Sequence, residues 1–224
     1  MEDKLRTQPK KKHSHRYKLK DGSFAASVTT IINQESGWNK QALINWAKRL
    51  SSQGYDVDEE LREAGKIGTL LHLLIEARQD GYDPDTRDFT PNQEKVAMIC
   101  FGGYLEWEGK GRYKTLASEI VLVNEELRVG GTIDSIGMMG DALVITDYKS
   151  SKNMYPEHIV QLGAYMMLYE MAQPKAKFSH GMVLRFGKDD GKFHQHKIPR
   201  KKLEAGASAF RHWVQTYNLK KQLL

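Results

Sequence analysis

Residues 127–149 read LRVGGTIDSIGMMGDALVITDYK, and this stretch decides the fold. It contains two apolar segments, 127–136 and 142–148, with a turn at 138–141 between them. The second segment is apolar on both faces until its end, which is typical of a strand that is covered on both sides. The sequence therefore predicts two neighbouring strands joined by a turn.

Each of these strands carries an aspartate, Asp134 in the first and Asp147 at the end of the second. If the strands pair as a hairpin, the two carboxylates converge at one end of the sheet. Converging carboxylates repel each other unless a cation lies between them. Hard oxygen ligands of this kind favour Mg²⁺ or Mn²⁺. The hairpin therefore predicts a site for one of these two metals.

Lys149 lies two residues beyond Asp147 and so points to the same face of an extended strand. Its ammonium group can orient or deprotonate a water molecule and neutralise negative charge that develops during a reaction. Metal, water and lysine together suit hydrolysis of a phosphodiester. The alternative is that Asp147-Tyr148-Lys149 is an ordinary strand end that runs into a polar turn.

The periodicity of the chain changes near its middle. Apolar residues at helical spacing predict helices in the first half: a short one capped by Ser27, then 39–50, 58–78 with a joint near Gly65 and Gly68, and 92–109. The second half predicts strands 119–123, 127–136 and 142–148, helix 156–171, strands 178–186 and 192–198, and a helix opened by Pro199. This order predicts an α/β (α+β) fold with a central mixed sheet flanked by helices.

Composition limits the class of protein. A chain of 224 residues with 40% apolar and 28% charged residues is expected to form one folded domain. The single cysteine, Cys100, excludes a disulfide framework and any multi-cysteine zinc or iron–sulfur site. No apolar run reaches the ~20 residues of a membrane span, so we expect a soluble protein without a membrane partner. No glycine-rich fingerprint follows a strand, so we expect no nucleotide cofactor.

The basic charge is concentrated at the N-terminus. Residues 1–20 hold eight basic and two acidic side chains, which accounts for the net charge of +6, and the rest of the chain is neutral. We therefore expect a basic, flexible arm over 1–22 and a single domain over 23–224, helical over 23–112 and sheet-containing over 113–224. Such an arm either meets a polyanion or is simply a solvated terminus. It lacks the apolar core of a secretory signal.

Two helical pairs add candidate site residues. His72 and Glu76 lie four residues apart on one face of a predicted helix, with apolar neighbours. His72 is either a core histidine or, beside a carboxylate pair, a metal ligand. Gln161 and Tyr165 form a second such pair, in the helix that follows the aspartate hairpin. This pair either contacts a nucleic acid through its amide and its ring or lies on an ordinary helix surface.

Four motifs in order carry a resemblance. They are Gly68-Thr69-x-x-His72-x-x-Ile75-Glu76, Gly131-x-x-Asp134, Asp147-Tyr148-Lys149 and Gln161-x-x-x-Tyr165. This arrangement resembles the RecB-type branch of the PD-(D/E)XK nucleases. Residues 26–32, with Trp46 following, are similar to the N-terminal part of phage exonucleases related to mitochondrial genome maintenance exonuclease. The resemblance covers residues 24–186 and implies a restriction-endonuclease-like core with an N-terminal helical region.

The resemblance also implies roles for single residues. Asp134, Asp147 and Lys149 would be catalytic, and the metal ligands would be His72, Asp134, Asp147 and the Tyr148 carbonyl. Gln161 and Tyr165 would contact DNA and brace the site. Glu119 would take a supporting or metal-proximal role, and Glu76 would be a ligand, a supporting residue or a surface residue. The proline of the family name is absent, because Ile133 precedes Asp134.

The function expected on this basis is that of a metal-dependent deoxyribonuclease, an exonuclease on single-stranded DNA or DNA ends in phage or bacterial replication, recombination or repair. The location implied is the cytoplasm of a bacterium or an infected host. No helicase motor is present, so unwinding would need a helicase partner, and a single-strand annealing or binding protein is a further expected partner. The alternatives are a structure-specific or nicking endonuclease, a non-catalytic DNA-binding recombination accessory protein, and a protein-interaction domain.

Overall fold

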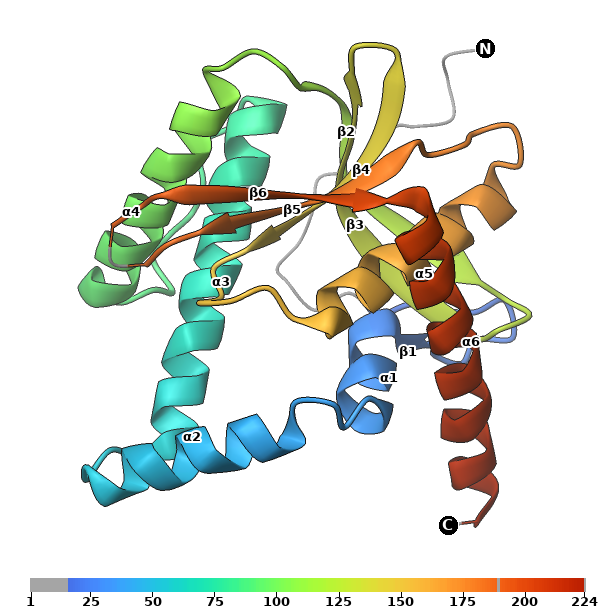
Figure 1. Cartoon of the computed structure of the whole chain (residues 1–224), viewed down its shortest axis with the longest axis horizontal. Helices are drawn as coiled ribbons and strands as arrows, with labels where there is room; N and C mark the ends of the chain where they lie inside the picture. The colour runs from blue at the N-terminus through green and yellow to red at the C-terminus, as the bar shows by residue number, and fades with distance from the viewer. Residues whose placement is uncertain (1–15, 189, 224) are drawn as a thin grey trace.

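The computed structural model describes residues 16–188 and 190–223. Six helices and six strands make up this part of the chain, and four of the helices precede the second strand (Figure 1). The helices are α1 (Val28–Glu35), α2 (Lys40–Ser52), α3 (Val57–Asp80), α4 (Pro91–Glu108), α5 (Pro156–Ala172) and α6 (Arg200–Leu223). The strands are β1 (Ala26–Ser27), β2 (Lys114–Asn124), β3 (Val129–Met139), β4 (Ala142–Lys149), β5 (His180–Phe186) and β6 (Phe193–Pro199).

One six-stranded mixed sheet forms the centre of the molecule. β2, β3 and β4 form an antiparallel meander, α5 returns the chain so that β5 lies parallel to β4, and β6 is antiparallel to β5. β3 and β4 are the expected hairpin, paired from Met139↔Ala142 to Ser135↔Thr146. The predicted fold class is therefore confirmed, and so is the predicted element order apart from β1.

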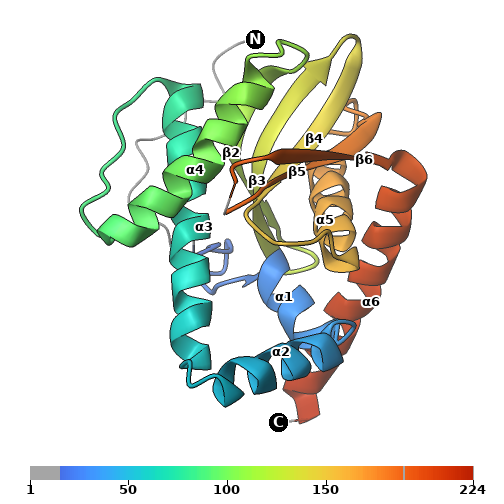
Figure 2. The same ribbon diagram turned by 60° about the vertical axis from the view of Figure 1, so that its left-hand side comes forward.

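Helices cover both faces of the sheet (Figures 1 and 2). On one face, α1, α5 and α6 pack over side chains that include Ile133, Ile145 and Val183. On the other face, α3 and α4 pack over Val144 and Tyr148. Because β4 contributes to both clusters, its run of apolar residues on both faces was a correct signal of an interior strand. None of the helices in the described part of the chain is long and apolar enough to cross a membrane.

Three local features differ from the sequence expectations. The predicted joint near Gly65 and Gly68 is wrong, since α3 is continuous over 24 residues. Burial of its second half, from Ile67 to Ala77, outweighs the low helix propensity of the two glycines. β2 begins at Lys114, five residues before the predicted strand, and the residues Lys114 to Ala117 that were missed carry no run of β-branched apolar side chains. The short strand β1 was not predicted. The Ser27 cap is confirmed: its side chain accepts a hydrogen bond from the N–H of Thr30.

Residues 16–22 of the expected arm lie against the body of the protein, and residues 1–15 lie outside the described residues. The Tyr17 hydroxyl is 3.1 Å from Oγ1 of Thr132 on β3. The Tyr17 ring occupies the space where a side chain on Gly130 would stand. Leu19 is buried. A glycine at the start of β3 therefore makes room for the segment that precedes β1.

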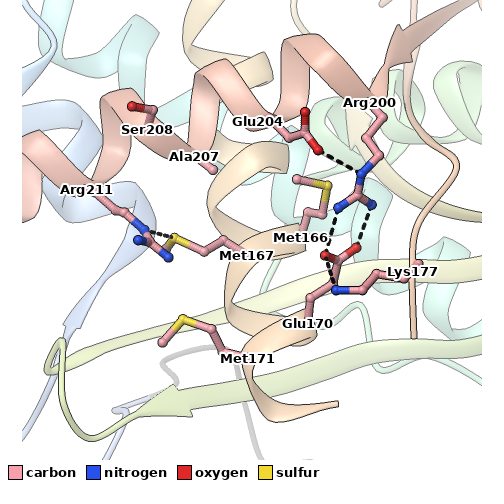
Figure 3. Close-up of a pocket in the computed structure, with 10 residues that line it drawn as sticks. All are labelled: Met166, Met167, Glu170, Met171, Lys177, Arg200, Glu204, Ala207, Ser208 and Arg211. Atoms are coloured by element: carbon pink, nitrogen blue, oxygen red, sulfur yellow. Dashed lines mark hydrogen bonds and ion pairs between the residues drawn. The ribbon is translucent and has the colours of Figure 1, made fainter. Parts of the chain in front are cut away.

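An ion pair ties the end of α5 to the start of α6. Arg200 donates two hydrogen bonds to the Glu170 carboxylate, at 2.8 and 3.0 Å, and Lys177 lies 3.4 Å from the same group. Figure 3 shows these side chains at one end of a surface pocket of about 450 Å³ between the two helices. The hydrogen bond with Arg200 and the bond from the Phe178 N–H lower the pKa of Glu170 to about 2. Glu170 therefore stays ionised well below the pH at which an ordinary glutamate is protonated.

Gly163 of α5 and Gly206 of α6 allow these two helices to cross closely. A Cβ atom at Gly163 would lie 2.4 Å from the Leu203 carbonyl oxygen, and one at Gly206 would lie 2.7 Å from the Ile159 carbonyl oxygen. Both contacts are with backbone, which cannot move aside without displacing a helix. The α5–α6 pair is therefore held at a distance that only glycine permits.

Gly163→Ala is expected to lower the free energy of unfolding by about 1–3 kcal/mol, because the added methyl group overpacks the helix crossing. The matched control is Gly65→Ala in α3, where a Cβ atom meets nothing within 4 Å. That variant should gain up to about 1 kcal/mol from the better helix propensity of alanine. Urea unfolding followed by circular dichroism measures both. Equal effects of the two substitutions would contradict the close crossing.

Candidate active site

The Asp134 carboxylate joins three elements of the fold. Asp134 lies on β3 at the point where the pairing of β3 with β4 ends. Its Oδ2 accepts a hydrogen bond of 2.7 Å from the N–H of Tyr148 on β4. Its Oδ1 lies 3.5 Å from Nδ1 of His72 on α3. The carboxylate thus accepts the Tyr148 N–H in place of a backbone carbonyl where the two strands part. Its other oxygen faces α3.

His72 contacts both strands of the hairpin. Its second ring nitrogen, Nε2, is 3.0 Å from the carbonyl oxygen of Tyr148. Burial alone would lower the pKa of His72, but the charges of Asp134 and Glu119 raise it to about 9. The protonated ring donates from both nitrogens, which matches the two acceptors around it. Burial would likewise raise the pKa of Asp134, but the charges of His72 and Lys149 hold the pKa of this carboxyl below its usual range.

Asp147 and Lys149 form an ion pair beside Asp134. The Lys149 Nζ lies 2.8 Å from each oxygen of the Asp147 carboxylate. Asp147 is only 1% exposed. Burial raises the pKa of Asp147 to about 6, with repulsion from Asp134 adding to the rise and Lys149 opposing it. The expected convergence of the two aspartates and the lysine is therefore present in the structure.

Glu119 reaches the same place from β2. The residues on either side of it pair with Ser135 and Ile133 of β3, which places Glu119 opposite Asp134. Glu119 itself has φ of 48°, in the left-handed region, although it lies inside a strand. A non-glycine residue in that region costs roughly 1–2 kcal/mol. Strain of this kind at a charged residue points to a functional requirement for its side chain.

His72, Glu119 and Asp134 can share a cation. One ligand atom from each lies within 4.8 Å of the other two. One imidazole nitrogen and two carboxylates form a suitable donor set for Mg²⁺ or Mn²⁺. Without a metal, a proton on His72 partly neutralises the two carboxylates. A metal would displace that proton, since only the neutral ring is a ligand.

Asp147 lies beside this group of ligand atoms without belonging to it, and the backbone carbonyl of Tyr148 lies next to His72. The oxygens of Asp147 face the Lys149 ammonium, and the Tyr148 carbonyl faces His72. Glu76 is buried one turn farther along α3 and hydrogen bonds the Tyr82 hydroxyl. The structure therefore brings six of the nine candidate residues together through side chains or backbone: His72, Glu119, Asp134, Asp147, Tyr148 and Lys149.

Gln161 and Tyr165 of α5 complete the surroundings. The Gln161 amide donates a 3.3 Å hydrogen bond to the Tyr165 hydroxyl, as their spacing of four residues suggested. Burial raises the pKa of Tyr165, and the charges of Asp134 and Asp147 add to the rise. A Cβ atom at Gly131 would overlap the Tyr165 ring, so this glycine of β3 lets the ring approach the strand.

Gln79 supports the site from behind and was not found from the sequence. It lies seven residues after His72 on α3, and its amide donates a 2.9 Å hydrogen bond to the Tyr148 hydroxyl. α3 therefore holds Tyr148 at both its carbonyl and its hydroxyl group. The spacing of two helical turns between His72 and Gln79 is the signal that could have linked them.

A family model described as the PD-(D/E)XK nuclease superfamily matches residues 88–221, which include β3, β4 and α5. The chain belongs to the PD-(D/E)XK nuclease superfamily. Nucleases of this superfamily use divalent metals, in agreement with the donor set around Asp134. The match begins after α3, so the structure alone connects His72 to the matched segment.

Solved structures with a likeness to this nuclease include an alkaline exonuclease, LHK-Exo, from Laribacter hongkongensis. It is 14% identical with a TM-score of 0.37, over 69% of this chain and 84% of that one. The structure of LHK-Exo in complex with dAMP is 12% identical with a TM-score of 0.35, over 69% of this chain and 84% of that one. A candidate exonuclease from Eubacterium rectale is 10% identical with a TM-score of 0.45, over 64% of this chain and 63% of that one. At these values the likenesses carry no functional argument. A comparison with curated proteins finds no match.

Replacement of Glu119 tests the strain in β2. Glu119→Gly and Glu119→Gln both remove the charge, but only glycine adopts a left-handed φ without cost. The glycine variant should be more stable than the glutamine variant by about 1 kcal/mol, since the greater freedom of glycine in the unfolded chain offsets part of the gain. Thermal unfolding of the two variants measures this. A less stable glycine variant would mean that the backbone at Glu119 is not strained.

Proposed function

We propose that this protein is a metal-dependent deoxyribonuclease that acts as an exonuclease on single-stranded DNA or DNA ends. The observation that carries the proposal is the meeting of Asp134, Asp147 and Lys149 at the end of one hairpin in a chain of this superfamily. A DNA-binding protein without catalysis has little use for buried carboxylates where phosphates would approach. The setting proposed is replication, recombination or repair of phage or bacterial DNA.

We assign the metal to His72 and Asp134, with Glu119 and Asp147 as the further carboxylates and Mg²⁺ or Mn²⁺ as the ion. When bound, such an ion polarises phosphoryl oxygens and lowers the pKa of water. The Tyr148 carbonyl, now facing His72, is a further ligand if the imidazole turns from it. Asp147 keeps the Lys149 ammonium in place, 2.8 Å away.

The protein's own groups then act on the phosphodiester. Lys149 neutralises the negative charge that develops on the phosphate and helps to orient the attacking water. Gln161 donates from its amide to a phosphate oxygen, and Tyr165 keeps Gln161 in position through the bond between them. The burial of Asp147 limits solvent around the reacting groups, so each charge acts at greater strength than in water.

The helix α2 supports the choice of single-stranded DNA. It lies away from the sheet, between α1 and α3 (Figure 2), and none of its residues is buried. It has three basic residues and no acidic one, and Leu43 and Ile44 are exposed beside them. Basic and apolar groups side by side suit a flexible strand, which presents both phosphates and base faces.

The way in which α2 is held at both ends supports an exonuclease that acts on the ends of DNA strands. α3 follows α2 directly, and before α2 the Trp38 ring packs on Trp213 of α6 with 4.8 Å between ring centroids. We infer that the strand reaches the site beneath α2, and beneath a helix held at both ends it can pass only by its free end. A covalently closed circle is therefore the substrate that separates an exonuclease from an endonuclease.

The test is cleavage of end-labelled single-stranded, duplex and circular single-stranded DNA with Mg²⁺, Mn²⁺ or EDTA. We expect cleavage of linear strands only, lost in EDTA. Lys149→Ala and Asp147→Asn should lower the rate at least about 100-fold, because each removes a group that stabilises the transition state.

Lys201→Ala, on the exposed face of α6, is the matched control and should cleave at the wild-type rate. Full activity of the Asp147 or Lys149 variant would contradict the assignment of the site. Cutting of circles would replace the exonuclease with an endonuclease. DNA binding without cleavage in the presence of either metal would contradict the nuclease and indicate a non-catalytic DNA-binding protein.

A further inference from the structure

A group of cationic and imidazole side chains lies on the sheet next to Lys149. Lys149 of β4 is paired in register with Arg185 of β5, and Asp147 with Val183, which in turn pairs with His196 of β6. Side chains of directly opposed residues project from the same face of a sheet. Arg185 and His196 therefore stand on the face that carries Asp147 and Lys149, one and two strands away.

Arg185 has donors without acceptors. Its Nη1 donates to the Ser151 carbonyl oxygen at 3.3 Å, and its Nε is enclosed without a hydrogen-bond partner. No carboxylate pairs with it among residues 16–188 and 190–223. A guanidinium has five N–H donors and keeps its charge at any ordinary pH. A half-buried arginine in this condition is unfavourable unless an anion completes its surroundings.

The two histidines add donors around the same place. The Nε2 of His196 is also enclosed without a partner in the described part of the chain. His158 of α5 accepts the Tyr155 N–H at its Nδ1, so the neutral ring carries its proton on Nε2. Burial lowers the pKa of His158 to about 3, and the charges of Lys149 and His196 contribute. Burial lowers the pKa of His196, and the positive charge of Arg185 lowers it further. Both rings thus lie in a positive local field.

We propose that Arg185, His158 and His196 form a phosphate subsite beside Lys149, which binds the phosphate next to the one that is cleaved. Arginine binds phosphate oxygens through two parallel N–H groups, and the imidazole N–H groups donate to the remaining oxygens. Each of the three residues is half-buried as a whole, so part of it remains within reach of a ligand although Arg185 Nε and His196 Nε2 are enclosed. The assignment rests on the proposed nuclease function, because it extends that site along the DNA strand.

The test is binding of three probes in EDTA, measured by isothermal titration calorimetry. The probes are dTpdT and the same dinucleotide with one more phosphate at its 5′ or its 3′ end. The wild-type protein should bind one of the two longer probes about tenfold more tightly than dTpdT, since a hydrogen-bonded charge pair is gained. The end that carries the effect also gives the direction of the strand.

Arg185→Gln should abolish this preference and leave the affinity for dTpdT unchanged, and Arg185→Lys should keep part of it. The control is Arg211→Gln, exposed on α6, which should retain the full preference. Circular dichroism checks that each variant folds. An unchanged preference in Arg185→Gln, or none in the wild-type protein, would overturn the subsite.

The two proposals fail separately in this design. If the wild-type protein cleaves DNA and the Arg185→Gln variant keeps the preference for the longer probe, only the subsite is contradicted. A protein that never cleaves DNA, yet loses the preference in Arg185→Gln, contradicts the nuclease and supports a phosphate-binding site on the sheet.

Discussion

The Asp134 carboxylate is the constraint on which the rest of the site depends. It is buried between the N–H of Tyr148 and the imidazole of His72, so it connects β3, β4 and α3 through two oxygens. A buried carboxylate is costly unless its charge is matched and its oxygens accept hydrogen bonds. The position of α3 against the sheet, and with it the geometry of the proposed metal ligands, follows from satisfying this one group.

The same constraint explains features away from the site. α3 presents His72 to Asp134 because its second half packs on the sheet, and its second contact with Tyr148, through Gln79, keeps it there. Gly131 lets the Tyr165 ring close the site from the opposite face. The left-handed conformation of Glu119 brings a further carboxylate beside Asp134, and the burial of apolar residues elsewhere offsets its strain.

Much of this arrangement follows from local patterns in the sequence. The apolar run before Asp147 predicted an interior strand, and the turn before it predicted the hairpin that brings Asp134 close. Contacts between distant segments were harder to predict. Nothing near Arg185 indicates that it lies opposite Lys149, because strand register depends on the whole sheet. The left-handed φ of Glu119 was likewise not predicted, because its neighbours Ser118 and Ile120 are ordinary strand residues that pair in register with β3.

The most direct test of this account is Mn²⁺ binding to the wild-type protein and to Asp134→Asn, measured by isothermal titration calorimetry. The asparagine keeps the volume of the side chain and an oxygen for the Tyr148 N–H, but it removes the charge that attracts His72 and that we assign to the ion. The account predicts saturable binding to the wild-type protein and a loss of affinity of at least about tenfold in the variant. Equal affinity of the two proteins for Mn²⁺ would contradict the central place given to Asp134.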